Sequence, residues 1–290
     1  MTGLITRRRA LALLGASMFA HPLRAAEEER PVRFGLTAVV VRENLQFFER
    51  WRHYLEQRIG RPVRFVQRRS YREIMGLLQT GEIDFAWICG YPYVQKREPE
   101  FLELMAVPVF MGEPLYSSYI IVHRDNPATS LSDLKGKVFA YSDPDSNSGY
   151  LVPRFLLAST GALPDNFYRL TFFTYNHAET VEAIANRVAD GGAVDSYVWE
   201  FMAKTRPAVT ERTKIILRSQ KFGFPPLVTR SAADQELKRR MQAAILGMKE
   251  DIDGRSLLAE LALDSFSPAT PVLFDGIRAV AQRMSEGGKP

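Results

Sequence analysis

A run of small polar residues in front of an apolar segment is the part of the sequence most suited to chemistry. The stretch "YSDPDSNSGYLVPR" spans residues 141–154, and its Ser-Asn-Ser-Gly core precedes apolar residues at helical spacing. An enzyme with a P-loop would have Gly-Lys-Ser/Thr at such a place, because the Lys contacts phosphates and the hydroxyl holds Mg²⁺. This run offers hydrogen-bond donors for an anion without the catalytic lysine.

The predicted helix that follows would add backbone donors to the same place. The first turn of a helix leaves N–H groups unpaired and carries partial positive charge. Ser146, Asn147 and Ser148 add side-chain donors there, and Gly149 allows close approach of the backbone. Pro153 is tolerated in a first turn and places the helix start near Gly149. The segment therefore predicts a cradle for a tetrahedral oxyanion. The alternative is that Ser148 only caps the helix.

Residues 1–26 have the pattern of an export signal. Arginines occupy positions 7–9, an apolar run covers 10–20, and small residues follow at Ala25 and Ala26. The apolar run is too short to span a bilayer. The paired arginines in front of it favour the twin-arginine route, with the Sec route as the alternative. No Cys ends the leader, so we expect a free protein in the periplasm rather than a lipoprotein.

Charge and cysteine content exclude several other classes of protein. The formal charge is +5, and the four arginines of the leader reduce it to +1 for the remaining chain. A near-neutral surface gives no reason to expect a nucleic acid or an anionic membrane as partner. Cys89 is the single cysteine, as in an exported protein without a disulfide. Because His53, His123 and His177 lack the spacing of a zinc motif, we expect no metal and no cofactor.

Strand and helix patterns alternate from residue 31 onward. Ser70 and Glu73 form a capping box before a helical pattern that ends at Gly81. A β-α-β-α-β order predicts a parallel sheet with right-handed crossovers. The expected strands are 32–39, 62–68 and 83–90, and the expected helices are 44–60 and 70–81. The strand at 83–90 is apolar nearly throughout, as in a central strand covered on both faces.

A second unit repeats this order after a predicted crossing of the chain. Its expected strands are 137–142, 169–175 and the start of 191–201, and its helices are 148–161 and 178–191. We therefore expect an α/β fold of two lobes. Residues 31–116 and 225–290 would form lobe 1, and residues 120–220 would form lobe 2. The crossing segments are predicted at 116–122 and 219–226, and the C-terminal helices are expected to return to lobe 1.

Four segments together resemble one known family. "DPDSNSGYLVP" closely resembles the D-P-x-S-T-S-G-[FYH]-L-V-P motif of periplasmic binding proteins of phosphate, phosphite and phosphonate ABC transporters. "GEIDFAWICGYPYV", "SSYIIVHRDNPATSLSDLKGK" and "NHAETVEAIANRVADGGAVDS" resemble further segments of that family in the same order. The resemblance covers residues 33–226. It implies a type II periplasmic binding protein fold, in which each lobe is a mostly parallel sheet flanked by helices.

The resemblance also assigns ligand contacts. Ser146, Asn147 and Ser148 would bind the oxyanion directly, with Asn147 in place of the family's usual Thr. Tyr93 would supply a phenolic O–H from the opposite lobe, unless it only packs in the cleft wall.

Two further positions fall in or near the family's cleft. They are His177, whose alternative is a turn or capping role, and Asp195. A carboxylate there could accept a hydrogen bond from a protonated ligand oxygen or pair with a ligand amine.

Cys89 departs from the family pattern, which usually has Gly there. A free Cys at the end of a buried strand most often behaves as a small apolar residue. The other interpretation rests on a resemblance to periplasmic arsenite sensors, in which a cleft cysteine bonds arsenic and the protein informs a membrane histidine kinase. That chemistry requires an accessible sulfur.

Three functions follow from these features. The first is a monomeric binding protein, not an enzyme, that closes over a small oxyanion and delivers it to an ABC permease in the inner membrane. The second is the periplasmic sensor acting on a histidine kinase. The third is an enzyme with Cys89 as nucleophile and His177 as base, which no partner motif supports. The ligand stays open among phosphate, phosphite, phosphonates and arsenite.

Overall fold

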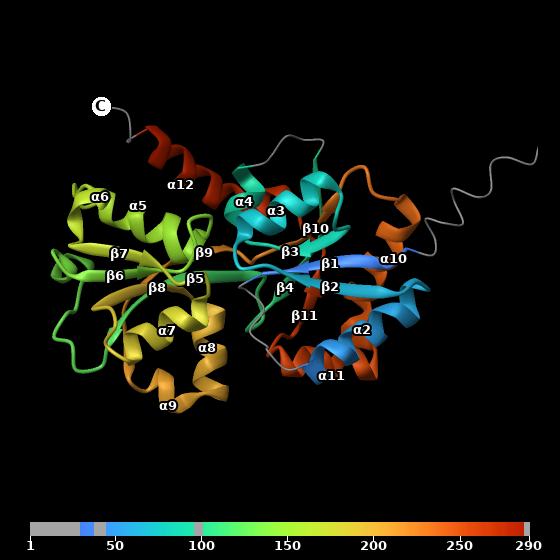
Figure 1. Ribbon diagram of the computed structural model, residues 1–290, viewed down its shortest axis with the longest axis horizontal. Helices are drawn as coiled ribbons and strands as arrows, with labels where there is room; N and C mark the ends of the chain where they lie inside the picture. The colour runs from blue at the N-terminus through green and yellow to red at the C-terminus, as the bar shows by residue number, and fades with distance from the viewer. Residues whose placement is uncertain (1–29, 38–44, 96–100, 287–290) are drawn as a thin grey trace, which may run out of the picture.

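The structure, a computed structural model, describes residues 30–37, 45–95 and 101–286. Two lobes lie side by side, each with a sheet between helices (Figure 1). The predicted leader at 1–26 lies outside the described residues. Among the residues described, no helix is long and apolar enough to cross a membrane.

Lobe 1 is built on a sheet with the strand order β11-β4-β10-β3-β1-β2. β1 pairs in parallel with β2 and β3, as the predicted crossovers require, and β10 and β11 join antiparallel to their neighbours. The strands are β1 (Val32–Leu36), β2 (Val63–Gln67), β3 (Phe85–Trp87), β4 (Leu102–Val109), β10 (Leu227–Arg230) and β11 (Ser265–Ser267).

Local signals predict the ends of α3 correctly, whereas α4 (Gly90–Gln95) begins at a residue that was predicted to end the strand 83–90. α3 starts after Ser70, which forms the predicted capping box with Glu73, and it ends at Gly81 in a left-handed conformation. The C-terminal helices α10 and α11 pack on α2. The helices are α2 (Leu45–Ile59), α3 (Tyr71–Thr80), α4 (Gly90–Gln95), α10 (Gln235–Leu246), α11 (Ile252–Glu260) and α12 (Asp275–Glu286), with short 3₁₀ segments at Gly247–Glu250 and Pro271–Phe274.

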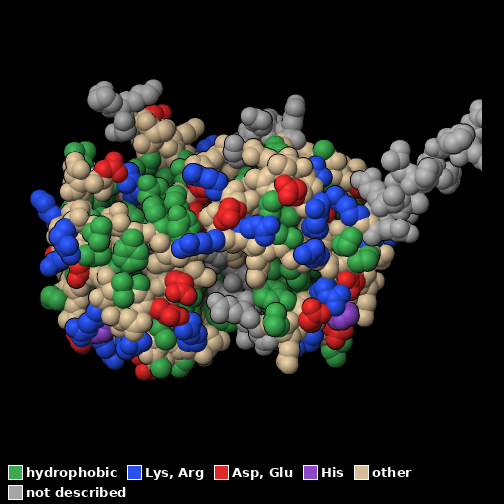
Figure 2. All heavy atoms as spheres, in the orientation of Figure 1, with side chains coloured by type: hydrophobic (Ala, Val, Ile, Leu, Met, Phe, Trp, Pro, Cys, Tyr) green, Lys and Arg blue, Asp and Glu red, His purple; other side chains and the backbone are tan. Residues whose placement is uncertain are grey.

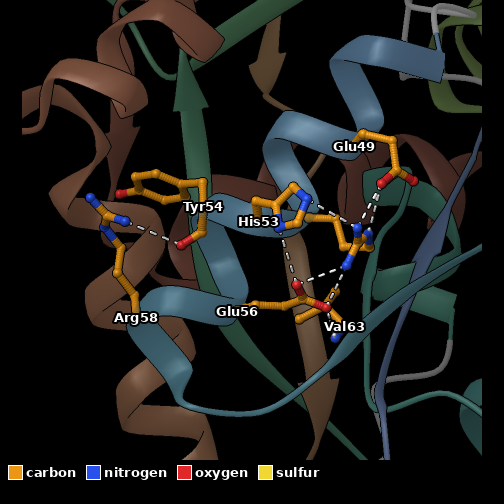
Figure 3. A network of polar contacts seen from close by, with 7 residues as sticks. Glu49, His53, Tyr54, Glu56, Arg58 and Val63 are labelled. Atoms are coloured by element: carbon orange, nitrogen blue, oxygen red, sulfur yellow. Dashed lines mark hydrogen bonds and ion pairs between the residues drawn. The ribbon is translucent and has the colours of Figure 1, made fainter.

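A polar network attaches α2 to the edge strand β2 (Figure 3). Arg52 donates to the carboxylates of Glu49 and Glu56, at 2.6 and 2.8 Å. Glu56 also accepts a hydrogen bond of 2.9 Å from the backbone N–H of Val63, the first residue of β2. The opposite face of α2 buries Trp51 against Phe34 of β1. The helix is thus fixed to the sheet on two sides.

Lobe 2 is built on a second sheet with the strand order β7-β6-β8-β5-β9. β6 pairs in parallel with β7 and β8, and β5 lies antiparallel between β8 and β9. The strands are β5 (Leu115–His123), β6 (Val138–Tyr141), β7 (Leu170–Phe173), β8 (Gly191–Asp195) and β9 (Thr213–Gly223). The helices are the 3₁₀ segment Leu131–Leu134, a π-helical turn (Asn147–Leu151), α5 (Val152–Ala158), α6 (Pro164–Phe167), α7 (His177–Ala185), α8 (Ser196–Thr205) and α9 (Pro207–Thr210).

The chain passes between the lobes twice. It leaves lobe 1 after β4 and returns before β10, and the two crossings lie together because β5 and β9 pair from Leu115 opposite Gly223. α12 packs on α4 of lobe 1 and also contacts α5 of lobe 2 (Figure 1). The carboxyl ends of β3 and β6 therefore face each other across the boundary between the lobes.

Candidate binding site

The predicted cradle is a π-helical turn between β6 and α5. Within it, the N–H of Leu151 donates to the carbonyl of Ser146 at 3.0 Å. Pro153 has no N–H with which to satisfy the carbonyl of Gly149 in the helical ladder. That carbonyl instead accepts a hydrogen bond of 3.2 Å from the N–H of Ser142, at the end of β6. The α-helix consequently begins at Val152, later than the predicted start near Gly149.

Ser146, and not Ser148, caps this turn. The Ser146 hydroxyl oxygen accepts from the N–H of Gly149 at 2.9 Å. The Ser148 hydroxyl accepts no capping hydrogen bond: the Ser148 carbonyl accepts from the Ser118 hydroxyl at 2.6 Å, and the Ser148 hydroxyl is buried without a partner among the described residues. The capping alternative for Ser148 was therefore wrong, and its hydroxyl is available to a ligand.

Gly149 is required by the residues beneath the turn. A Cβ at this position would lie 2.5 Å from Cβ of Ser142 and 3.1 Å from Cε1 of His177. His177 Nδ1 accepts from the N–H of Asp195 at 3.1 Å and lies 2.9 Å from the Ser142 hydroxyl. Burial lowers the pKa of His177 to about 3, so the ring is neutral. His177 thus joins β6, α7 and β8 under the cradle.

Cys89 and Asn147 bring the two lobes together. The Cys89 sulfur, directly after β3, accepts from the backbone N–H of Asn147 at 3.2 Å. The Asn147 amide nitrogen donates to the hydroxyl of Tyr116, at the start of β5, at 2.9 Å. Burial raises the pKa of the Cys89 thiol to about 12, so the sulfur keeps its proton at neutral pH.

Two tyrosines in the site were not found from the sequence. The hydroxyl of Tyr71, the first residue of α3, is buried and has no partner in the part of the chain that the structure describes. Burial first, and then the proximity of Cys89 and other acidic groups, raises the pKa of this phenol. Tyr116 is buried beside it. Tyr71 could have been found, because it opens a helix at the carboxyl end of a strand, where α/β folds bind ligands.

Asp195 supplies a carboxyl group to the interior of the site. It caps α8 by accepting from the N–H of Tyr197 at 2.8 Å. Burial raises the pKa of Asp195 to about 7, and no Lys or Arg among the described residues contributes to that shift. The same carboxyl is close enough to raise the pKa of Tyr71 and of Tyr116.

The structure gathers seven of the eight predicted residues into one network. These residues are Cys89, Ser146, Asn147, Ser148, Gly149, His177 and Asp195. The eighth, Tyr93, is buried on α4, and its ring packs edge to face on Phe274 with centroids 5.0 Å apart. The described residues contain no cluster of His, Cys, Asp and Glu suited to a metal ion.

The rim of the site holds the lobes in contact through charged groups. The N–H of Tyr71 donates to the Asp143 carboxylate at 3.2 Å, and Arg72 pairs with Asp145 at 3.2 Å. The guanidinium of Arg69 lies 4.8 Å from the ring centre of Tyr175. On the face drawn in Figure 2, Lys and Arg side chains lie over both lobes and beside the lobe boundary.

The site therefore encloses several polar atoms that can bind a small solute. The Tyr71 hydroxyl, the Ser148 hydroxyl and the Asn147 side-chain oxygen are all buried without partners among the residues described. Such groups are costly to leave unpaired, and their concentration between two lobes is typical of a ligand site.

Comparison with known proteins decides the family. Residues 34–273 match the family described as the periplasmic substrate-binding protein of phosphonate ABC transporters. The chain belongs to this family. The phosphonates-binding periplasmic protein of Escherichia coli K12 is 22% identical over 278 residues, which cover 93% of this chain and 81% of that protein.

Two solved structures share the fold. A binding protein component of an ABC phosphonate transporter from Pseudomonas aeruginosa superposes with a TM-score of 0.79 at 24% identity, covering 87% of this chain and 86% of that one. PhnD1 from Prochlorococcus marinus, in complex with methylphosphonate, has a TM-score of 0.76 at 17% identity, with 88% and 98% covered. The predicted two-lobed type II periplasmic binding protein fold is confirmed.

Proposed function

We propose that this chain captures a small phosphonate-type oxyanion in the cleft between its lobes and presents it to an ABC permease. The observation that carries the proposal is the set of buried, unpartnered atoms on Tyr71, Asn147 and Ser148 between the lobes, as the described residues have them. Membership of a transport family and the methylphosphonate bound to a relative of the same fold support it.

Each wall of the cleft contributes part of the ligand contact. From lobe 2, the hydroxyls of Ser146 and Ser148 donate to the anion, and Gly149 lets it approach the backbone. From lobe 1, the Tyr71 hydroxyl donates from the opposite side. A ligand that contacts both walls stabilises the closed arrangement, because only that arrangement provides all of the contacts.

The remaining predicted residues have supporting roles in this proposal. His177 and Asp195 position the cradle through their hydrogen bond of 3.1 Å. Tyr93 was predicted as a ligand contact, and its packing on Phe274 favours a role in placing α4. We infer that the chain is exported to the periplasm by its leader, by the twin-arginine route, and acts there as a monomer.

The geometry favours transport over the other two functions. An enzyme would need Cys89 and His177 within hydrogen-bond reach. Cys89 accepts from Asn147, whereas His177 bonds Ser142 and Asp195. A buried thiol that keeps its proton also disfavours thiolate chemistry, including a bond to arsenic.

Removing single hydroxyls from the two walls tests the proposal. Tyr71→Phe and Ser148→Ala should each lower the affinity for methylphosphonate about tenfold, and the double variant about a hundredfold, by titration calorimetry. Tyr168→Phe is the matched control, because its hydroxyl is also buried and unpartnered in the described chain but belongs to the core of lobe 2. Unchanged affinity in the double variant would overturn the proposal.

A further inference from the structure

Asn147 uses its backbone N–H and one of its two side-chain N–H groups inside the protein. Its backbone N–H is bonded to the Cys89 sulfur at 3.2 Å, and its side-chain amide nitrogen is bonded to the Tyr116 hydroxyl at 2.9 Å. The side-chain oxygen is fully buried and has no partner in the described structure. Since an amide oxygen can only accept hydrogen bonds, Asn147 offers the ligand an acceptor.

This acceptor distinguishes Asn147 from its neighbours on the turn. The hydroxyls of Ser146 and Ser148 can each donate or accept, so they adapt to any oxyanion oxygen. A Thr at position 147 would carry a hydroxyl with the same freedom. If the ligand oxygen that faces the Asn147 oxygen carries no hydrogen, two hydrogen-bond acceptors face each other. Neither oxygen is then paired, and the two repel each other.

The charge of the interior points in the same direction. The carboxyl of Asp195 is buried, and no Lys or Arg of the described chain compensates it. It lies near enough to Tyr71 and Tyr116 to act on both phenols. A ligand that has lost all of its hydrogens would bring two negative charges into this interior, where no Lys or Arg of the described chain lies beside Asp195 to compensate them, at a high cost. A ligand that keeps one hydrogen lowers its charge and also supplies a donor.

Given the proposed function, we propose that the Asn147 oxygen selects a tetrahedral oxyanion that retains a hydroxyl hydrogen. The preferred ligand class is therefore the singly protonated phosphonate or phosphate. A tetrahedral anion of the same shape and charge without a hydroxyl is rejected, because it leaves the Asn147 oxygen unpaired. Asn147 acts here as a specificity-determining residue.

Methanesulfonate provides the matched ligand. It has the shape and the single charge of the methylphosphonate monoanion but no hydroxyl hydrogen. In titration calorimetry of the wild-type chain at mildly acidic pH, methylphosphonate should bind at least about tenfold more tightly than methanesulfonate. Equal affinity would overturn the inference and leave the proposed function standing. Failure of both anions to bind would overturn both.

Asn147→Thr tests whether this residue is responsible. A Thr hydroxyl can donate to a sulfonate oxygen, so the ratio of the two affinities should fall to less than about threefold. Asn166→Thr, at an exposed position on α6, is the control and should keep the wild-type ratio. An unchanged ratio in Asn147→Thr would overturn the assignment. The wild-type comparison needs no variant and stands if this variant fails to fold.

Discussion

The interior of the site and its rim differ in the charged groups that they contain. The interior contains hydroxyls, a protonated thiol and an amide, and the Asp195 carboxyl within it has no cation beside it among the described residues. The rim instead carries the Arg72–Asp145 ion pair, in which the Arg72 side chain is 78% exposed. Exposed ion pairs contribute little, whereas buried unpaired groups are expensive. Recognition should therefore depend on the neutral interior, and the rim should modulate it weakly.

The largest effect on stability is expected from adding a side-chain atom at Gly149, next to Ser142. Gly149→Ala places a Cβ 2.5 Å from Cβ of Ser142, inside a packed interior, and should lower the free energy of unfolding by about 3 kcal/mol. Gly76→Ala is the control, because its Cβ meets nothing within 4 Å inside α3. The control should raise stability by about 0.5–1 kcal/mol. Urea unfolding measures both, and a stable Gly149→Ala protein would contradict the tight packing described here.

An intermediate effect is expected at Asp143, between interior and rim. Burial, the largest cause, raises the pKa of Asp143 to about 6. The folded state therefore holds this proton more tightly than the unfolded state does. The contribution of Asp143 to stability is greatest below about pH 4 and is lost as the pH rises through about 6.

Asp143→Asn removes this titration and keeps an oxygen for only one of the two N–H groups, of Tyr71 and Asp145, that bond separate carboxylate oxygens; that loss does not depend on pH. The unfolding free energy of the variant, relative to wild type, should rise by about 2 kcal/mol between about pH 4 and pH 7. Urea unfolding at several pH values measures the difference. A constant difference across that range would show that Asp143 does not titrate in this way.

The smallest effect is expected on the rim. Arg72→Gln removes the ion pair with Asp145 and should change the affinity for methylphosphonate by less than about threefold at low salt. The difference should vanish at high salt, where exposed charges are screened. Calorimetry at two salt concentrations tests this. A large loss of affinity that persists in high salt would contradict the weak role expected for the rim.

Features determined by local sequence were predictable. The capping box of Ser70 and Glu73 and the left-handed Gly81 are at the predicted boundaries of α3, because each depends on neighbouring residues. The cradle was placed correctly after β6. Its π-helical turn was not predicted, because it depends on the contact between Ser142 and the Gly149 carbonyl, which forms only when β6 and the turn meet.

The wall of lobe 1 was only partly predictable. Cys89 was expected to face the cradle, and its sulfur accepts from the Asn147 N–H, a contact that depends on how the lobes meet. Tyr71 and Tyr116 were missed because they come from separate segments that converge only in three dimensions. The predicted lobe boundaries and ligand contacts stay predictions.

Tyr71 carries one further consequence. Its amide hydrogen reaches the Asp143 carboxylate on lobe 2, while its phenol enters the shared interior. Any rotation that parts the lobes withdraws both groups together. The population of the closed arrangement and the binding of the solute are therefore linked in a single equilibrium. A permease that recognises the closed arrangement could thus detect bound solute without contacting it.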